Sequence, residues 1–151
     1  MSNGDGSVNP NKQERIAWLG LIVSLVACAY LATHLFQANG LAMGPDGDVA
    51  RIVPRMMAVF LVGVYLIGRR DASPLADERD REIQAKRTHA AYFALALMLT
   101  VAGATLGMDA YRSFWESRSV GWLESGLMLM LVASIAVHAS VGLFLYRKDR
   151  Q

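Results

Sequence analysis

The chain of 151 residues has few of the features that mark several common kinds of protein. Its one cysteine, Cys28, cannot form an internal disulfide or a metal site built on cysteine ligands. The formal net charge of +2 is too small to indicate binding to nucleic acid. The chain has no Gly-rich phosphate loop, nucleophile–base pairing or H-x-x-x-H pattern. We therefore expect no enzymatic activity, no cofactor, no metal and no nucleic-acid partner.

Charge is also missing from four long stretches of sequence. A helix of about 20 apolar residues crosses the hydrocarbon core of a bilayer, which is about 30 Å thick. Three of the stretches reach this length, and the second comes close. The sequence predicts an all-α, polytopic membrane protein with four transmembrane helices in an antiparallel bundle. The uncharged stretches are Ile16 to Pro45, Met56 to Gly68, Thr88 to Met108 and Ser125 to Tyr146.

The four predicted spans cover about residues 16–36, 51–68, 88–108 and 120–146. Residues 1–13 are rich in Asn, Gly and Ser, which predicts a disordered tail. Residues 14–151 then form a single four-helix transmembrane domain, because the loops are too short to bury a core of their own.

The positions of lysine and arginine predict the orientation of the spans. Most of these residues lie in the two tails and in the loop between the second and third spans. Because positive charge is retained on the cytoplasmic side of a membrane, we expect both termini and this loop in the cytoplasm. The residues are Lys12, Arg15, Arg69, Arg70, Arg79, Arg81, Lys86, Arg87, Arg147, Lys148 and Arg150.

Small residues predict how the helices pack in lipid. In the third span, Gly103 and Gly107 form a G-x-x-x-G pair on a stripe that also holds Thr100. We interpret this stripe as a packing seam, with a track for a ligand as the alternative. Similar faces on the first and fourth spans would complete the bundle interior, with the second span more peripheral. These faces comprise Gly20, Ser24, Ala27, Leu31 and His34, and Ser134, His138 and Gly142.

His138 is the deepest ionisable side chain of the predicted spans, about 12 Å from the cytoplasmic boundary. Two interpretations stay open. As a functional group it would relay protons or bind a ligand, as ionisable residues inside membranes often do. As a structural group it would be neutral and hydrogen-bonded to Ser134 or Thr100.

Three more polar residues are expected near the outer interface. Glu124 begins the fourth span, and Arg55 and His34 lie at similar depth on the second and first spans. With Arg51 they are able to form a rim cluster that admits an anion or substrate. The alternative is a structural Arg–Glu pair at the level of the lipid headgroups.

The segment 74–87 predicts a cytoplasmic helix that continues into the third span. Acidic residues crowd its start and basic residues its end, which suits the helix dipole. Glu82 and Lys86 are also spaced for an i, i+4 ion pair. The helix is either a self-paired, solvated extension or a surface on which another chain docks.

Asp77, Glu78 and Arg79, followed by Ile83, Ala85 and Lys86, carry a resemblance to a known group of proteins. The chain resembles an uncharacterised family of small predicted four-helix membrane proteins of bacteria and archaea, which carry a D-E-R-x-x-x-I-like motif before their third span. The resemblance implies the four-helix fold and no mechanism. It favours the charged helix as the docking surface, with Asp77, Glu78, Arg79, Ile83 and Lys86 as its residues.

We therefore predict a non-enzymatic accessory or regulatory protein of the inner (cytoplasmic) membrane. Its partners would be the bilayer and either a second copy, forming a homodimer, or another membrane or cytoplasmic protein. The alternative is a small proton-coupled transporter that works as an oligomer and uses Glu124 and His138. Small four-helix multidrug exporters are the comparison for this alternative, but they depend on a glutamate in their first span. Here that span has no carboxylate.

Overall fold

The structure, a computed structural model, describes residues 12–37, 48–70 and 78–148. These residues form helices and no strand, so the all-α class is confirmed. Of the predicted disordered tail, residues 1–11 lie outside the described residues, whereas Lys12 and Gln13 already belong to the first helix. The helices are α1 (Lys12–Gln37), α2 (Asp48–Arg70), α3 (Glu78–Leu106), the short 3-10 helix η1 (Asp109–Tyr111), α4 (Arg112–Glu116) and α5 (Val120–Lys148).

Three helices, α1, α3 and α5, are long and apolar enough to cross a membrane. This property is typical of a membrane protein, which the uncharged stretches of the sequence also predict. Helix α2 has 23 residues but is not among the three. Only residues 54–69 of α2 are described with their side chains, a segment shorter than a transmembrane span.

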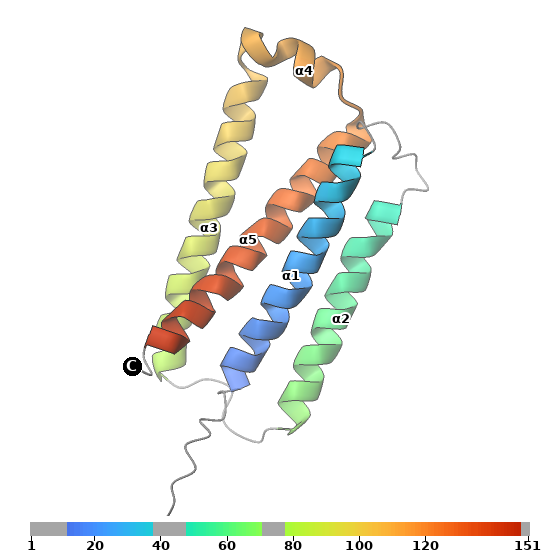
Figure 1. The fold of residues 1–151 in the computed structure, drawn as a ribbon. Coiled ribbons are helices and arrows are strands. Elements are labelled where there is room, and N and C mark those ends of the chain that lie inside the picture. The colour runs from blue at the N-terminus through green and yellow to red at the C-terminus, as the bar shows by residue number, and fades with distance from the viewer. Residues whose placement is uncertain (1–11, 38–47, 71–77, 149–151) are drawn as a thin grey trace, which may run out of the picture.

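The long helices lie side by side in the order α3, α5, α1, α2 (Figure 1). Helix α1 packs against both α5 and α2, while the main contact of α3 is with α5. Figure 1 shows that α3 and α5 are close where α3 begins and separate toward η1 and α4. The arrangement is therefore a layer, in which α3 and α2 form the two sides and α1 and α5 lie between them.

The core lies between α1 and α5. Ala27, Leu31 and Val132 are buried together, and Leu31 is completely inaccessible. Ala27 and Leu31 belong to the small-residue face predicted for the first span, together with the buried residues Gly20 and Ser24. Small side chains allow two helix backbones to approach closely, which is how helices associate in lipid.

Hydroxyl groups in the apolar helices donate hydrogen bonds to their own backbones. Ser24 Oγ donates to the carbonyl of Gly20 at 2.7 Å, and Ser125 Oγ to that of Gly121 at 2.8 Å. Such bonds satisfy polar groups where no water is present. At the start of α5, Ser119 Oγ accepts a hydrogen bond from the backbone N–H of Trp122 at 3.2 Å, as an N-cap residue does.

Candidate functional site

A group of buried residues joins the start of α3 to the end of α5. Tyr146 Oη donates a hydrogen bond to Asp80 Oδ1 at 3.0 Å, and both side chains are buried. Ile83 and Arg87 follow on the same face of α3, since residues spaced i, i+3 and i+7 align on a helix. We call Asp80, Ile83, Arg87, Gly142 and Tyr146 the boundary cluster, because Arg87 directly precedes the predicted third span.

Arg87 is the central residue of the boundary cluster. Only 7% of it is exposed, and it packs against Gly142 of α5. A Cβ atom built on Gly142 would lie 3.2 Å from Arg87 Cδ and 3.3 Å from Nη1, so the glycine leaves the space that the arginine occupies. The same Cβ would lie 3.9 Å from Ala17 Cβ, which brings α1 to the cluster as well.

The buried guanidinium of Arg87 is only partly satisfied. Its Nη2 donates to Gln84 Oε1, and the Asp80 carboxylate attracts it electrostatically. Its Nε, however, is buried and finds no acceptor among the described residues. A buried cation is costly unless its charge and its N–H groups are matched, so this arginine is a site where an anion would be favourable.

The exposed side of the same helix carries the other charged residues. Glu78, Arg79, Arg81, Glu82 and Lys86 are all exposed. Lys86 Nζ lies 2.7 Å from Glu82 Oε1, which is the i, i+4 ion pair expected from the sequence. We call these five residues the extension face. The burial of the boundary cluster thus gives the start of α3 a buried side and a charged outer side.

The residues predicted to dock a partner do not all lie on the extension face. Glu78, Arg79 and Lys86 do, and Asp77 lies outside the described residues. Ile83 differs from the expectation: only 5% of it is exposed, because it packs inward with the boundary cluster. It therefore supports the position of the helix and is not accessible to another chain.

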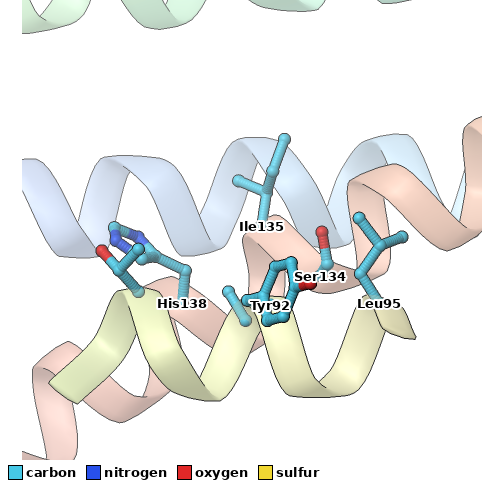
Figure 2. A pocket seen from close by; sticks show the side chains of 7 residues that line it. Tyr92, Leu95, Ser134, Ile135 and His138 are labelled. Carbon is cyan, nitrogen blue, oxygen red and sulfur yellow. The ribbon is translucent and has the colours of Figure 1, made fainter. Parts of the chain in front are cut away.

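A groove of about 340 Å³ lies between α3 and α5, beside the boundary cluster. Figure 2 shows His138 at one end, Leu95 at the other, and Tyr92, Ser134 and Ile135 between them. Thr88 and Ala91 of α3 complete the lining. The groove holds two of the predicted intramembrane polar residues, Ser134 and His138.

The hydrogen bonds expected for His138 are not formed. Ser134 Oγ donates to the carbonyl of Leu131 at 2.7 Å, and Thr100 Oγ1 donates to that of Ala96 at 2.7 Å. Both hydroxyls thus bond within their own helices, and neither bonds to His138. The imidazole instead lies half-buried at the end of the groove, where it interacts electrostatically with Arg87.

Of the four residues predicted to form the outer rim, three are described with their side chains, and the Arg51 side chain lies outside the described part of the chain. Arg55 and Glu124 are both exposed, and no ion pair joins them within the described part of the chain. The ring of His34 lies 4.4 Å from that of Tyr30 on its own helix. Glu124 also lies 14 residues before His138 on α5, which is roughly 21 Å along the helix.

The G-x-x-x-G seam expected on the third span is not used within this chain. Gly103 and Gly107 are exposed, and a Cβ atom on Gly103 would meet no atom within 4 Å. For Gly107 the only atoms within that distance belong to its own helix. The expectation of a buried face fails here because α3 has already separated from α5 at this level (Figure 1).

Sequence analysis did not predict the aromatic cluster around α4. The rings of Phe114, Trp115 and Trp122 meet nearly edge to face, with centroids 5.3 to 6.0 Å apart. Arg118 lies over the Phe114 ring at 4.4 Å and over the Trp122 ring at 5.1 Å. The i, i+4 spacing of Phe114, Arg118 and Trp122 is the sequence signal for this stack. Aromatic rings and arginine are typical of the membrane–water interface.

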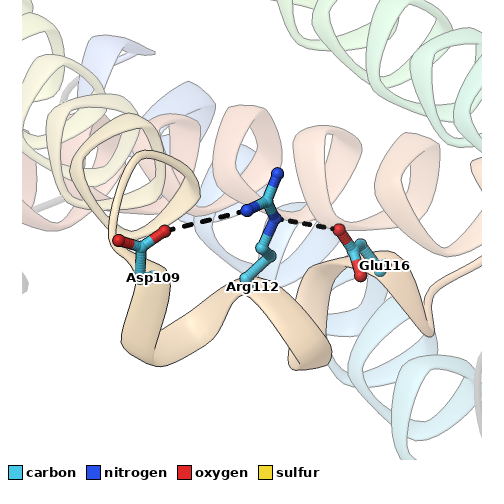
Figure 3. Close-up of polar contacts among 3 residues, drawn as sticks. All are labelled: Asp109, Arg112 and Glu116. Carbon is cyan, nitrogen blue, oxygen red and sulfur yellow. Dashed lines mark hydrogen bonds and ion pairs between the residues drawn. The ribbon is translucent and has the colours of Figure 1, made fainter.

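A smaller polar contact lies at the turn between η1 and α4. Figure 3 shows Arg112 between two carboxylates, with Nη1 3.9 Å from Asp109 Oδ1 and Nε 3.1 Å from Glu116 Oε1. All three side chains are exposed, so the contact contributes little to stability. It provides a useful control for the charged residues of the extension face.

The described residues contain no group of three or more His, Cys, Asp or Glu side chains that could hold a metal ion. Comparison of the chain with models of protein families, with curated proteins and with solved structures gives no match. The boundary cluster, the extension face and the groove are therefore the features of the molecule that bear on its function.

Proposed function

We propose that this chain is a non-enzymatic accessory or regulatory protein of the cytoplasmic membrane, which docks a protein partner on the extension face. In this proposal α1, α2, α3 and α5 form four antiparallel spans, with both termini and the start of α3 in the cytoplasm. The distribution of lysine and arginine supports this orientation. For α2, the uncharged stretch Met56 to Gly68 would cross the membrane while the exposed Arg55 side chain extends outward.

The length of α3 supports an extension outside the hydrocarbon. Its 29 residues span roughly 44 Å, whereas the hydrocarbon core is about 30 Å thick. The surplus corresponds to about nine residues, which is close to the length of the charged segment 78–87 at the start of the helix. The extension face would then lie in the cytoplasm beside the membrane.

The boundary cluster is the observation on which the proposal rests. The Tyr146–Asp80 hydrogen bond, the burial of Ile83 and the packing of Arg87 on Gly142 all fix the extension against α5. A fixed helix presents its outer charges in one arrangement, so a partner of complementary charge loses little entropy when it binds. A solvated linker between two spans would need no such attachment.

The test exchanges charges on the extension face without breaking its ion pair. In the double variant Glu82→Lys and Lys86→Glu the two residues still attract each other, but a partner meets the opposite pattern of charge. We expect partners cross-linked to the full-length protein in membranes to be lost from this variant. The protein level and helix content should stay unchanged, because exposed ion pairs of this kind contribute only about 0.3–0.5 kcal/mol.

The matched control is Arg112→Glu with Glu116→Arg, which exchanges an exposed i, i+4 pair near α4. Partners should be retained in this control. Retention of the same partners in both double variants would contradict docking on the extension face.

The transporter alternative receives less support from the geometry. Glu124 and His138 lie roughly 21 Å apart along α5, and Glu124 is exposed. Groups that pass protons must approach within hydrogen-bonding distance, directly or through water. Unchanged growth and transport phenotypes in a Glu124→Gln, His138→Ala double variant would remove this alternative.

A further inference from the structure

The groove between α3 and α5 changes in polarity along its length. His138 lies at the end nearest the boundary cluster, and Leu95 lies at the other end (Figure 2). Thr88 adjoins Arg87 in sequence, and Ser134, near Leu95, donates its hydroxyl to its own helix. In the proposed topology the polar end extends from the level of the lipid headgroups at Thr88 to His138 inside the hydrocarbon, and the apolar end lies deeper in the hydrocarbon. The same order of polar and apolar groups is found in a phospholipid.

Buried positive charge lies beside the polar end of the groove, on Arg87, which is not itself a lining residue. Arg87 directly precedes Thr88 in sequence and acts electrostatically on His138. The Asp80 carboxylate, seven residues before Arg87, is the acidic group that acts on this arginine, and it already accepts the hydrogen bond from Tyr146. Lys86 lies on the outer side of α3, paired with Glu82, and does not line the groove. An anion at this end would meet the Arg87 charge and, after a change of rotamer, its unpartnered Nε.

The groove is also accessible from the side that would face lipid. Tyr92 is 74% exposed and Ile135 is 40% exposed, although both line the groove. A lipid acyl chain could therefore enter sideways from the bilayer. A water-soluble anion would gain nothing from the apolar lining of Ala91 and Leu95, and a neutral lipid would gain nothing from Arg87.

We propose that this groove binds an anionic phospholipid, with one acyl chain along Ala91, Leu95 and Ile135 and the phosphate at the His138 end near Arg87. The inference goes beyond the docking of a protein partner and does not depend on it, although it rests on the proposed topology, with the start of α3 outside the bilayer. It depends on the charge at one end of the groove and on the apolar lining at the other.

The first experiment uses the full-length wild-type protein in mild detergent. Native mass spectrometry measures the binding of phosphatidylglycerol and of phosphatidylcholine with identical acyl chains. We expect phosphatidylglycerol to bind about fivefold more tightly, since one basic residue near the membrane surface contributes about this factor. Glycerol phosphate, which has the headgroup charge without acyl chains, should not displace the lipid.

The second experiment fills the groove. Ala91→Trp places a large ring among the lining residues and should weaken phosphatidylglycerol binding about tenfold. The matched control is Leu97→Trp, which puts the same ring on the exposed side of α3 outside the groove. Arg87→Gln should abolish the preference for phosphatidylglycerol over phosphatidylcholine, whereas Arg87→Lys should retain it. Helix content and a single monodisperse peak confirm that each variant is folded, and Ala91→Leu replaces the tryptophan variant if that one aggregates.

Several results would overturn the proposal. Equal binding of the two lipids by the wild-type protein would exclude a role for charge, and this measurement needs no variant. Complete displacement by glycerol phosphate would exclude a role for the acyl chain. Equal binding by the Ala91→Trp and Leu97→Trp variants would place the lipid elsewhere on the protein.

Discussion

Helices α1 and α3 both carry small residues along one face, but only α1 buries them. On α1 the face of Gly20, Ser24 and Ala27 packs toward α5 and α2, and a Cβ atom on Gly20 would lie 3.5 Å from the Phe60 ring. On α3, Gly103 would gain a Cβ atom without meeting any neighbour within 4 Å. Small residues therefore permit close packing, but the path of the neighbouring helix determines whether packing occurs.

The largest difference between the two helices should appear at their leucines. Leu31→Ala opens a cavity in the completely buried core and should lower the free energy of unfolding by about 2–4 kcal/mol. Leu97→Ala, at a position on α3 that is 54% exposed, should cost less than about 1 kcal/mol. Unfolding by sodium dodecyl sulfate from a mild detergent, followed by circular dichroism, measures both values. Equal losses would mean that α3 is packed as tightly as α1.

Enlarging glycines tests the same contrast on α5 and α3. Gly142→Leu would displace Arg87 and should cost about 1–3 kcal/mol, as overpacking in a close-packed region does. Gly103→Leu, with open space around it, should leave stability unchanged or raise it slightly. The same detergent titration compares the two variants. A large loss in the Gly103 variant would show that another molecule covers this part of α3.

The hydrogen bond between α3 and α5 should have a smaller effect. Tyr146→Phe removes the donor to Asp80 and should lower the free energy of unfolding by about 1 kcal/mol. It should also speed hydrogen exchange of the first turns of α3, measured by mass spectrometry. Tyr92→Phe, at a position that is 74% exposed, is the control and should change neither quantity.

The smallest effect is expected for Gly103→Ala. Alanine is a better helix former than glycine by up to about 1 kcal/mol, and the new methyl group meets nothing on α3. The variant should therefore be more stable than the wild-type protein by about 0.5 kcal/mol in the detergent titration. A loss of stability in place of this gain would contradict an open face.

The course of the helices follows from the sequence for a simple physical reason. In lipid every backbone N–H and C=O group must be bonded within its segment, so long uncharged stretches become helices. Acidic residues at the start of α3 and basic residues near the membrane also predict its continuation outside the bilayer, and the structure has one unbroken helix from Glu78 to Leu106. The small-residue face of α1 was likewise predictable, because it repeats at helical spacing.

Other features depend on contacts between distant residues, which a single sequence does not reveal. Arg87 and Tyr146 are both expected at the membrane surface from their types and positions, yet both are buried. Arg87 is buried because Gly142, 55 residues later, leaves room for it, and Tyr146 because Asp80 accepts its hydrogen bond. The five-residue α4 was not predicted either, although the spacing of Phe114, Arg118 and Trp122 is a sequence signal for the stack beside it.

The attachment of α3 mainly near its start has a mechanical consequence. The buried residues of this helix are Asp80, Ile83 and Arg87, so the 19 residues from Arg87 to Leu106 form an arm of roughly 28 Å beyond the last of them. A tilt of only about 10° at that pivot would displace the far end by about 5 Å, following from the arm length. A displacement of the charged turns at the start of α3 would therefore produce a larger displacement of η1 and α4 at the opposite end of the helix.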